Sequence, residues 1–180
     1  MFEYPAILRK PAGEILAAFV AGGRPLVLGW AAFALAALLF APVAIAVARV
    51  TALPGRATQA VAALGVAAGV TQAIGLSRWV YAVPGLAAQW SAGDPDARAT
   101  VETVFLTLHQ SAGVGIGEAI GQTLTAFWLI GVALGQRDHP RFGAPVAGLG
   151  LLAGVVLLLG LVEGLSTCWG SIRAHSGWRR

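Results

Sequence analysis

Residues 26–50 read LVLGWAAFALAALLFAPVAIAVARV and contain no charged side chain before Arg49. A helix of about 20 apolar residues is long enough to cross the hydrocarbon core of a bilayer, which is about 30 Å thick. Trp30 lies near the start of this stretch, where an interfacial aromatic ring would meet the lipid headgroups. The stretch therefore predicts a membrane-spanning helix.

The whole chain shares this apolar character. Of its 180 residues, 57% are hydrophobic and only 11% are charged, and the mean hydropathy is +0.76. A water-soluble domain is usually about 45–50% apolar and about 25% charged. Too few polar side chains are present to cover a soluble globule, and disorder requires low hydrophobicity and high charge. The composition indicates an integral membrane protein.

Three further apolar stretches cover residues 57–80, 112–134 and 144–165, and polar turns with proline, glycine or arginine separate them. Together with residues 26–50 they predict an all-α integral membrane protein, a bundle of about four transmembrane helices. We expect a single membrane domain over residues 1–180, placed in a bacterial inner membrane.

The connecting segments predict interfacial amphipathic helices. Residues 1–24 combine charged side chains with an apolar run too short to span a bilayer. In the connection over residues 82–110, Asp94 followed by Pro95 indicates a helix start, and apolar residues recur at helical spacing beyond it. Residues 166–180 form a basic tail. Four spans place both termini on one side, and the larger number of basic residues on that side favours the cytoplasm.

Glycines recur at four-residue spacing in the third and fourth spans. Small residues at this spacing let helices approach closely in lipid. The positions expected to serve helix packing are Gly113, Gly117, Gly121, Gly150 and Gly154. Their packing could hold one bundle together or join two copies, and the sequence leaves both open.

Glu118 is the most informative ionisable residue, because it lies about seven residues inside the third span. A carboxylate inside the membrane is costly and should face a partner in the bundle. Arg78, at the end of the second span, is the expected partner. The other polar side chains that could join this cluster are Gln72, His109, Gln122 and Glu163. The cluster predicts either a binding site or a structural pair that fixes helix register.

The sequence gives little support for haem or metal ligation, for catalysis or for nucleic-acid binding. His109 and His139 flank the third span at opposite ends, and His175 lies in the tail, so no pair is suited to ligate haem. We expect no metal, no cofactor and no catalytic residue, since no hydrolase, metalloprotease or P-loop pattern is present. The basic residues are scattered, without the stripe that nucleic-acid binding requires.

Two segments, residues 75–86 with Arg78-Trp79 and residues 104–121 with Gly117-Glu118, resemble blocks of a bacterial membrane family. The segment Tyr4 to Arg9 resembles a third block. The family is catalogued as domain of unknown function 4386, and the resemblance covers about residues 4 to 165. It implies a multi-pass membrane protein without implying an activity. Ala119 stands where the family often has histidine, which weakens a metal or haem hypothesis further.

We therefore expect a non-enzymatic membrane protein, a structural or accessory subunit that packs against itself or against a larger membrane complex. The first alternative is a small transporter or ligand-binding protein with its site at Arg78 and Glu118. The second alternative is a redox subunit that binds haem or quinone.

Overall fold

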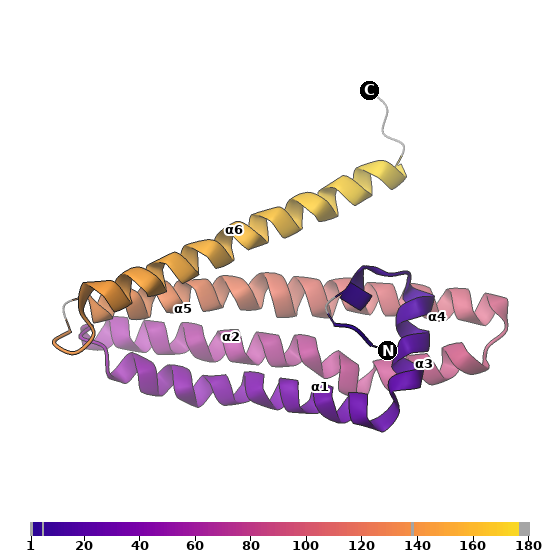
Figure 1. Ribbon diagram of the computed structural model, residues 1–180, viewed down its shortest axis with the longest axis horizontal. Coiled ribbons are helices and arrows are strands. Elements are labelled where there is room, and N and C mark those ends of the chain that lie inside the picture. Colours follow the sequence, from indigo (N-terminus) through magenta and orange to yellow (C-terminus); the bar gives the residue numbers. More distant parts are fainter. Residues whose placement is uncertain (1, 5, 138, 177–180) are drawn as a thin grey trace. The chain divides into compact units, whose positions relative to one another are not determined.

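The structure is a computed structural model, which describes the backbone of residues 2–4, 6–137 and 139–176 and the side chains as far as Leu161. The described chain is helical and contains no strand. Its elements are η1 (Ala6–Arg9), α1 (Ala12–Arg49), α2 (Gly55–Tyr81), α3 (Val83–Ala92), α4 (Pro95–Leu108), η2 (His109–Ile120), α5 (Gly121–Gln136) and α6 (Gly143–Ser176) (Figure 1). The predicted all-α class is confirmed.

Among the described residues, four helices are long and apolar enough to cross a membrane, as the sequence predicts. They are α1, the joined α2 and α3 (Gly55–Ala92), the continuous α4, η2 and α5 (Pro95–Gln136), and α6 in its described part (Gly143–Leu161). The protein is therefore a multi-pass membrane protein. The second and third of these helices are longer than the spans expected from hydropathy. The reason is that the amphipathic connection over residues 82–110 is itself helical, so it lengthens both helices, and the chain reverses direction at Gly93 and Asp94.

Contacts between residues divide the chain into two compact units. Unit 1 comprises Met1–Phe40 and Gly69–Ile120, and unit 2 comprises Ala41–Ala68 and Gly121–Arg180. Each unit has its own way of packing helices, and each is described separately below.

The first part of unit 1 is a short helix that ends at a glycine. Within α1, Gly23 has a φ of 53° and a ψ of −152°, which interrupts the helix after residue 22. A positive φ is costly for residues with a Cβ, so glycine is suited to this break. Ile15, Leu16 and Phe19 of the segment before the break are buried in the core of unit 1.

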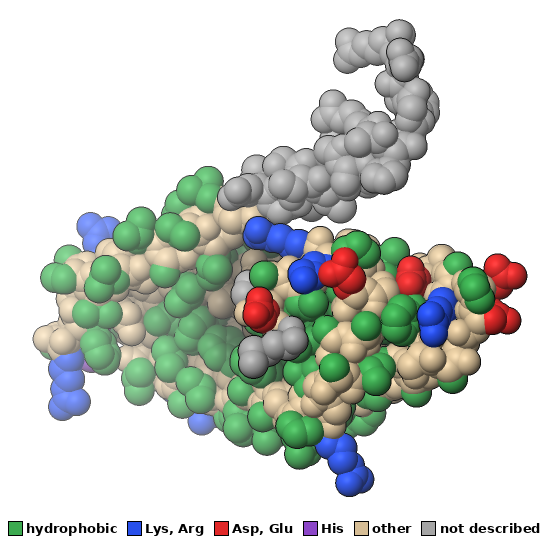
Figure 2. Space-filling model, turned by 45° about the vertical axis from the view of Figure 1, so that its right-hand side comes forward, with side chains coloured by type: hydrophobic (Ala, Val, Ile, Leu, Met, Phe, Trp, Pro, Cys, Tyr) green, Lys and Arg blue, Asp and Glu red, His purple; other side chains and the backbone are tan. Residues whose placement is uncertain are grey.

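The helices α3 and α4 form an antiparallel hairpin at one end of unit 1 (Figure 1). Asp94 caps α4, because its Oδ1 accepts a hydrogen bond from the backbone N–H of Ala97 at 2.9 Å. A side-chain hydrogen bond links the two helices, because Nε1 of Trp90 on α3 donates to Oε1 of Glu102 on α4 at 2.8 Å. Figure 2 shows acidic side chains gathered at this hairpin end.

In unit 2 the helices pack through glycine and alanine. The helix α6 runs back along α5 (Figure 1). A Cβ on Gly150 would meet the Cβ of Ala133 at 3.0 Å, and one on Gly154 would meet Ile130 at 2.7 Å. A Cβ on Gly131 would come 2.5 Å from Val61 on α2. The glycines therefore set the close approach of the helices in this unit.

Candidate functional site

A cluster of aromatic rings forms the core of unit 1 around Trp79, which is fully buried. The Trp79 ring stacks on Trp30 with centroids 5.0 Å apart and on Phe19 at 5.7 Å. Phe2 and Phe105 meet it edge-on at 5.7 and 6.0 Å. These rings come from α1, α2, α4 and the N-terminal segment, so the cluster ties four parts of unit 1 together.

Arg78 lies next to Trp79 and is almost completely buried, with 7% of its surface exposed. Its Nη1 donates to the carbonyl oxygen of Gly75, one turn earlier on α2. Its Nη2 lies 3.4 Å from Nδ1 of His109. The Nε of Arg78 has no hydrogen-bond partner among the described residues. One of the five guanidinium N–H groups is thus buried without an acceptor.

His109 is also 7% exposed and is the first residue of η2. Its ring stacks on Phe105 with centroids 5.7 Å apart and an interplanar angle of 14°. In η2 the chain forms a π-helix over His109–Ile120, a rare geometry that occurs mostly as single-turn bulges within α-helices, frequently at functional sites. The side chains of Arg78 and His109, with this π-helix, form what we call the Arg78–His109 centre.

Glycines make room for the centre. A Cβ on Gly113 would come within 2.5 Å of the Cζ and Nη2 of Arg78, so the guanidinium lies directly over this glycine. One turn later, a Cβ on Gly117 would lie 2.9 Å from the Cα of Gly75, so the backbones of η2 and α2 are in contact. In the structure these two glycines therefore pack against α2 of the same chain. Gly121, the next in the row, is buried at the start of α5.

The structure does not bring Arg78 and Glu118 to ion-pair distance. Glu118 is exposed, and the guanidinium contacts Gly75 and His109 instead. On η2 the residue that packs against Gly75 of α2 is Gly117, and the following residue, Glu118, is exposed. Glu118 remains an electrostatic neighbour of Arg78. The pairing expected from the sequence is replaced by a contact between Arg78 and His109.

The remaining residues of the expected cluster are placed differently. Gln72 is half-buried on α2 in unit 1. Gln122 is half-buried on α5 and belongs to unit 2, as does His139. The side chains of Glu163 and His175 lie outside the described residues. Gly75, which packs against Gly117 and accepts the hydrogen bond from Arg78, was not identified from the sequence. Small residues are frequent on α2, so their spacing does not distinguish Gly75 from the others.

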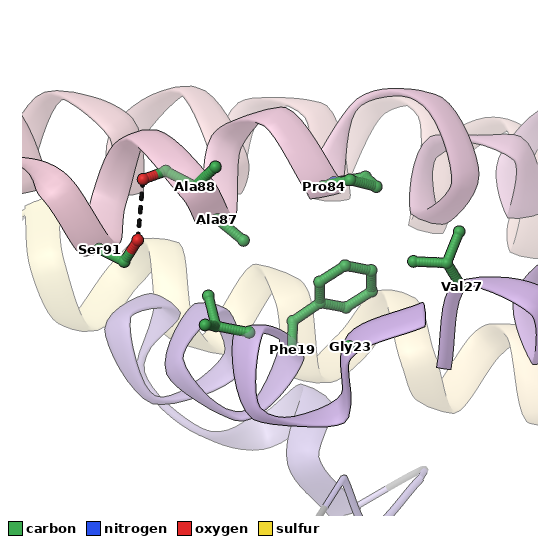
Figure 3. Close-up of a pocket in the computed structure, with 8 residues that line it drawn as sticks. Phe19, Gly23, Val27, Pro84, Ala87, Ala88 and Ser91 are labelled. Atoms are coloured by element: carbon green, nitrogen blue, oxygen red, sulfur yellow. Dashed lines mark hydrogen bonds between the residues drawn. The ribbon is translucent and has the colours of Figure 1, made fainter. Parts of the chain in front are cut away.

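An apolar groove of about 290 Å³ lies beside the aromatic cluster (Figure 3). It is lined from α1 by Phe19, Gly23 and Val27 and from α3 by Pro84, Ala87 and Ser91. The Ser91 hydroxyl donates to the carbonyl oxygen of Ala88 at 2.9 Å. Its proton is therefore used in a hydrogen bond within α3. No group of three or more His, Cys, Asp or Glu residues suited to a metal ion occurs in the described part of the chain.

Residues 1–172 match the family described as domain of unknown function 4386. The chain belongs to this family. No curated protein matches the chain, and no solved structure matches it. The family assignment and the four apolar helices together define a multi-pass membrane protein of unknown function.

Proposed function

We propose that this member of the family is a non-enzymatic, ligand-binding protein of the bacterial inner membrane, with its site at the Arg78–His109 centre. The observation that supports the proposal is the state of Arg78. Its guanidinium is buried, has no carboxylate within ion-pair distance among the described residues, and keeps Nε without an acceptor.

A buried cation without a counter-ion is unfavourable, because desolvation costs free energy that neutral acceptors only partly recover. Ionisable residues inside membrane helices are rare and mark binding sites or ion pathways. The planar guanidinium fork of arginine matches the two oxygens of a carboxylate. We therefore propose a ligand that carries a carboxylate, held by Arg78 and oriented by the His109 ring.

The test is to purify the protein from native membranes in mild detergent and identify the small molecules that co-purify by mass spectrometry. Arg78→Gln should lower the amount of a bound anionic molecule by at least tenfold, since a charged hydrogen bond contributes about 1.5–3 kcal/mol. Arg98→Gln is the matched control, because Arg98 is an exposed arginine on α4 of the same unit. His109→Gln serves as a second variant if Arg78→Gln does not fold.

An unchanged set of bound molecules in folded Arg78→Gln and His109→Gln would contradict the proposal. A second candidate function would then lead: a structural or accessory subunit that forms a homo-oligomer or joins a larger membrane complex. The exposed apolar face of α6, with Leu149, Leu152 and Leu159, favours this candidate, because lipid or a partner helix must cover it. Stoichiometric co-elution of other subunits in the same purification would support it.

A further inference from the structure

The α1–α2 turn and the α5–α6 turn of unit 2 are held together by their backbones. The N–H of Ala52 donates to the carbonyl oxygen of Gly135 at 2.9 Å. A Cβ on Gly135 would lie 2.7 Å from both the Thr51 Cβ and the Leu53 Cγ, so the turns are in close contact there. In the first turn, the Thr58 hydroxyl donates to the Leu53 carbonyl at 3.0 Å. The two turns therefore form one ordered surface.

A cavity of about 620 Å³ lies between these turns. Its charged and ring side chains are Arg49 from the end of α1, and His139, Arg141 and Phe142 from the second turn. Arg49 and Arg141 are exposed and have no ion-pair partner in the described chain. The cavity thus combines two available guanidinium groups with an imidazole and an exposed aromatic ring.

Every charged side chain that the structure describes in unit 2 is an arginine. The acidic residues of this unit are Asp138, which lies outside the described residues, and Glu163, whose side chain is not described. Two more exposed arginines, Arg56 and Arg137, lie near the same turns but do not line the cavity. Figure 2 shows arginine side chains, in blue, projecting from this part of unit 2. The field at the cavity therefore attracts anions.

The His139 ring is set to donate a hydrogen bond. Its Nδ1 accepts from the backbone N–H of Arg141 at 3.2 Å, so in the neutral ring the proton is on Nε2. Phe142 lies against the same ring, with centroids 4.9 Å apart. The turn thus arranges His139 and Arg141 as donors, and Phe142 and Val50 add apolar surface to the cavity.

We propose that this cavity binds the phosphate group of an anionic phospholipid. Arginine forks match phosphate oxygens, and basic pockets between transmembrane helices bind lipid headgroups. The position fits, because turns between membrane-spanning helices lie where headgroups are found. Phe142 and Val50 are suited to contact the glycerol and upper acyl region. The site is in unit 2 and does not depend on the Arg78–His109 centre.

The experiment is to reconstitute the full chain in bilayers of equal parts phosphatidylcholine and phosphatidylglycerol, extract it gently, and measure the retained lipids by native mass spectrometry. Each arginine near an anionic surface contributes about 1 kcal/mol, or about fivefold in affinity. The double variant Arg49→Gln, Arg141→Gln should therefore retain phosphatidylglycerol roughly 25-fold more weakly.

The matched control is Arg56→Gln, Arg137→Gln, which removes the same charge from the same turns but leaves the cavity side chains in place. We expect this pair to keep most of the phosphatidylglycerol. Equal losses in the two double variants would overturn the proposal, because they would indicate diffuse attraction rather than a site. Retention of phosphatidylcholine as strong as that of phosphatidylglycerol would also overturn it.

A further arm distinguishes lipid from soluble phosphate. Inorganic phosphate is added to the extracted wild-type protein, with sodium chloride of equal ionic strength as the reference. Retained phosphatidylglycerol in phosphate, at the level seen in sodium chloride, supports the lipid assignment. Selective displacement by phosphate would assign the cavity to a soluble phosphate ligand and overturn the lipid assignment.

Discussion

Unit 1 and unit 2 are built on different packing principles. The core of unit 1 is a cluster of large aromatic rings around Trp79, whereas unit 2 brings α2, α5 and α6 together over Gly131, Gly150 and Gly154. The charges differ in the same way. All the acidic side chains that the structure describes lie in unit 1, and the described ionisable side chains of unit 2 are arginines and a histidine.

The difference in packing follows from the surroundings of the helices, which are lipid and other helices in one case and a charged hairpin in the other. Where helices meet only lipid and one another, burial of apolar area does not favour association, so close van der Waals contact through small residues has to stabilise the bundle. The α3–α4 hairpin of unit 1 is too charged for hydrocarbon, so it can use hydrogen bonds such as Trp90 to Glu102 and the packing of rings. Substitutions in the two units should therefore have different costs.

The largest effect is expected at Trp79. Trp79→Ala removes the ring that contacts Phe19, Trp30 and Phe105, and it leaves a cavity in the core of unit 1. The cost in free energy of unfolding should be about 3–5 kcal/mol, as for other buried Trp or Phe residues. The measurement is thermal unfolding in mild detergent. Phe33→Ala is the control, because Phe33 is 62% exposed and should change stability little.

A loss at Trp79 no greater than at Phe33 would show that the aromatic cluster does not stabilise unit 1, and the contrast between the units would be wrong.

An intermediate effect is expected at Gly117, where two backbones meet. Gly117→Ala would place a Cβ 2.9 Å from the Cα of Gly75, and a backbone atom cannot move aside as a side chain can. We expect a loss of about 1–3 kcal/mol, the usual cost of overpacking. In unit 2, Gly150→Ala would meet Ala133 Cβ at 3.0 Å and should cost less.

Gly85→Ala is the control for helix propensity, since nothing lies within 4 Å of the added Cβ on Gly85 in α3. This variant should be neutral or stabilised by up to about 1 kcal/mol. Thermal unfolding of the three variants side by side gives the order. If Gly150→Ala destabilised the protein as much as Gly117→Ala, the backbone contact would have no special role in unit 1.

Hydropathy predicted the class and the number of spans because both depend on long averages over the chain. The lengths of the helices were not predictable in this way. Residues 82–110 form an amphipathic connection, and the charged side chains of α4 lower its hydropathy without ending the helix. Pro84 and Pro95 do not end helices here either, because each lies in the first turn of one.

The candidate site was predictable in its members but not in its contacts. Depth in the span singled out Glu118, and position at the helix end singled out Arg78. Which side chain Arg78 meets depends on the rotation of η2, and a π-helix shifts that rotation relative to an α-helix. His109, rather than Glu118, lies on the face that meets α2. The sequence carries no clear signal for a π-helix over His109–Ile120.

The smallest effect, and the sharpest test of this site, is expected at Glu118. Glu118→Gln removes an exposed carboxylate that makes no described hydrogen bond, so the free energy of unfolding should change by no more than about 0.5 kcal/mol. Arg78→Gln should cost about 1–3 kcal/mol, because the Gly75 carbonyl and His109 Nδ1 lose their buried donor. A double-mutant cycle between the two positions, measured by thermal unfolding, should give a coupling of no more than about 0.5 kcal/mol, because Glu118 is an exposed electrostatic neighbour and not an ion-pair partner. Strong coupling would mean that Arg78 and Glu118 form a pair in the membrane, and the centre would then have a carboxylate of its own instead of a place for one from a ligand.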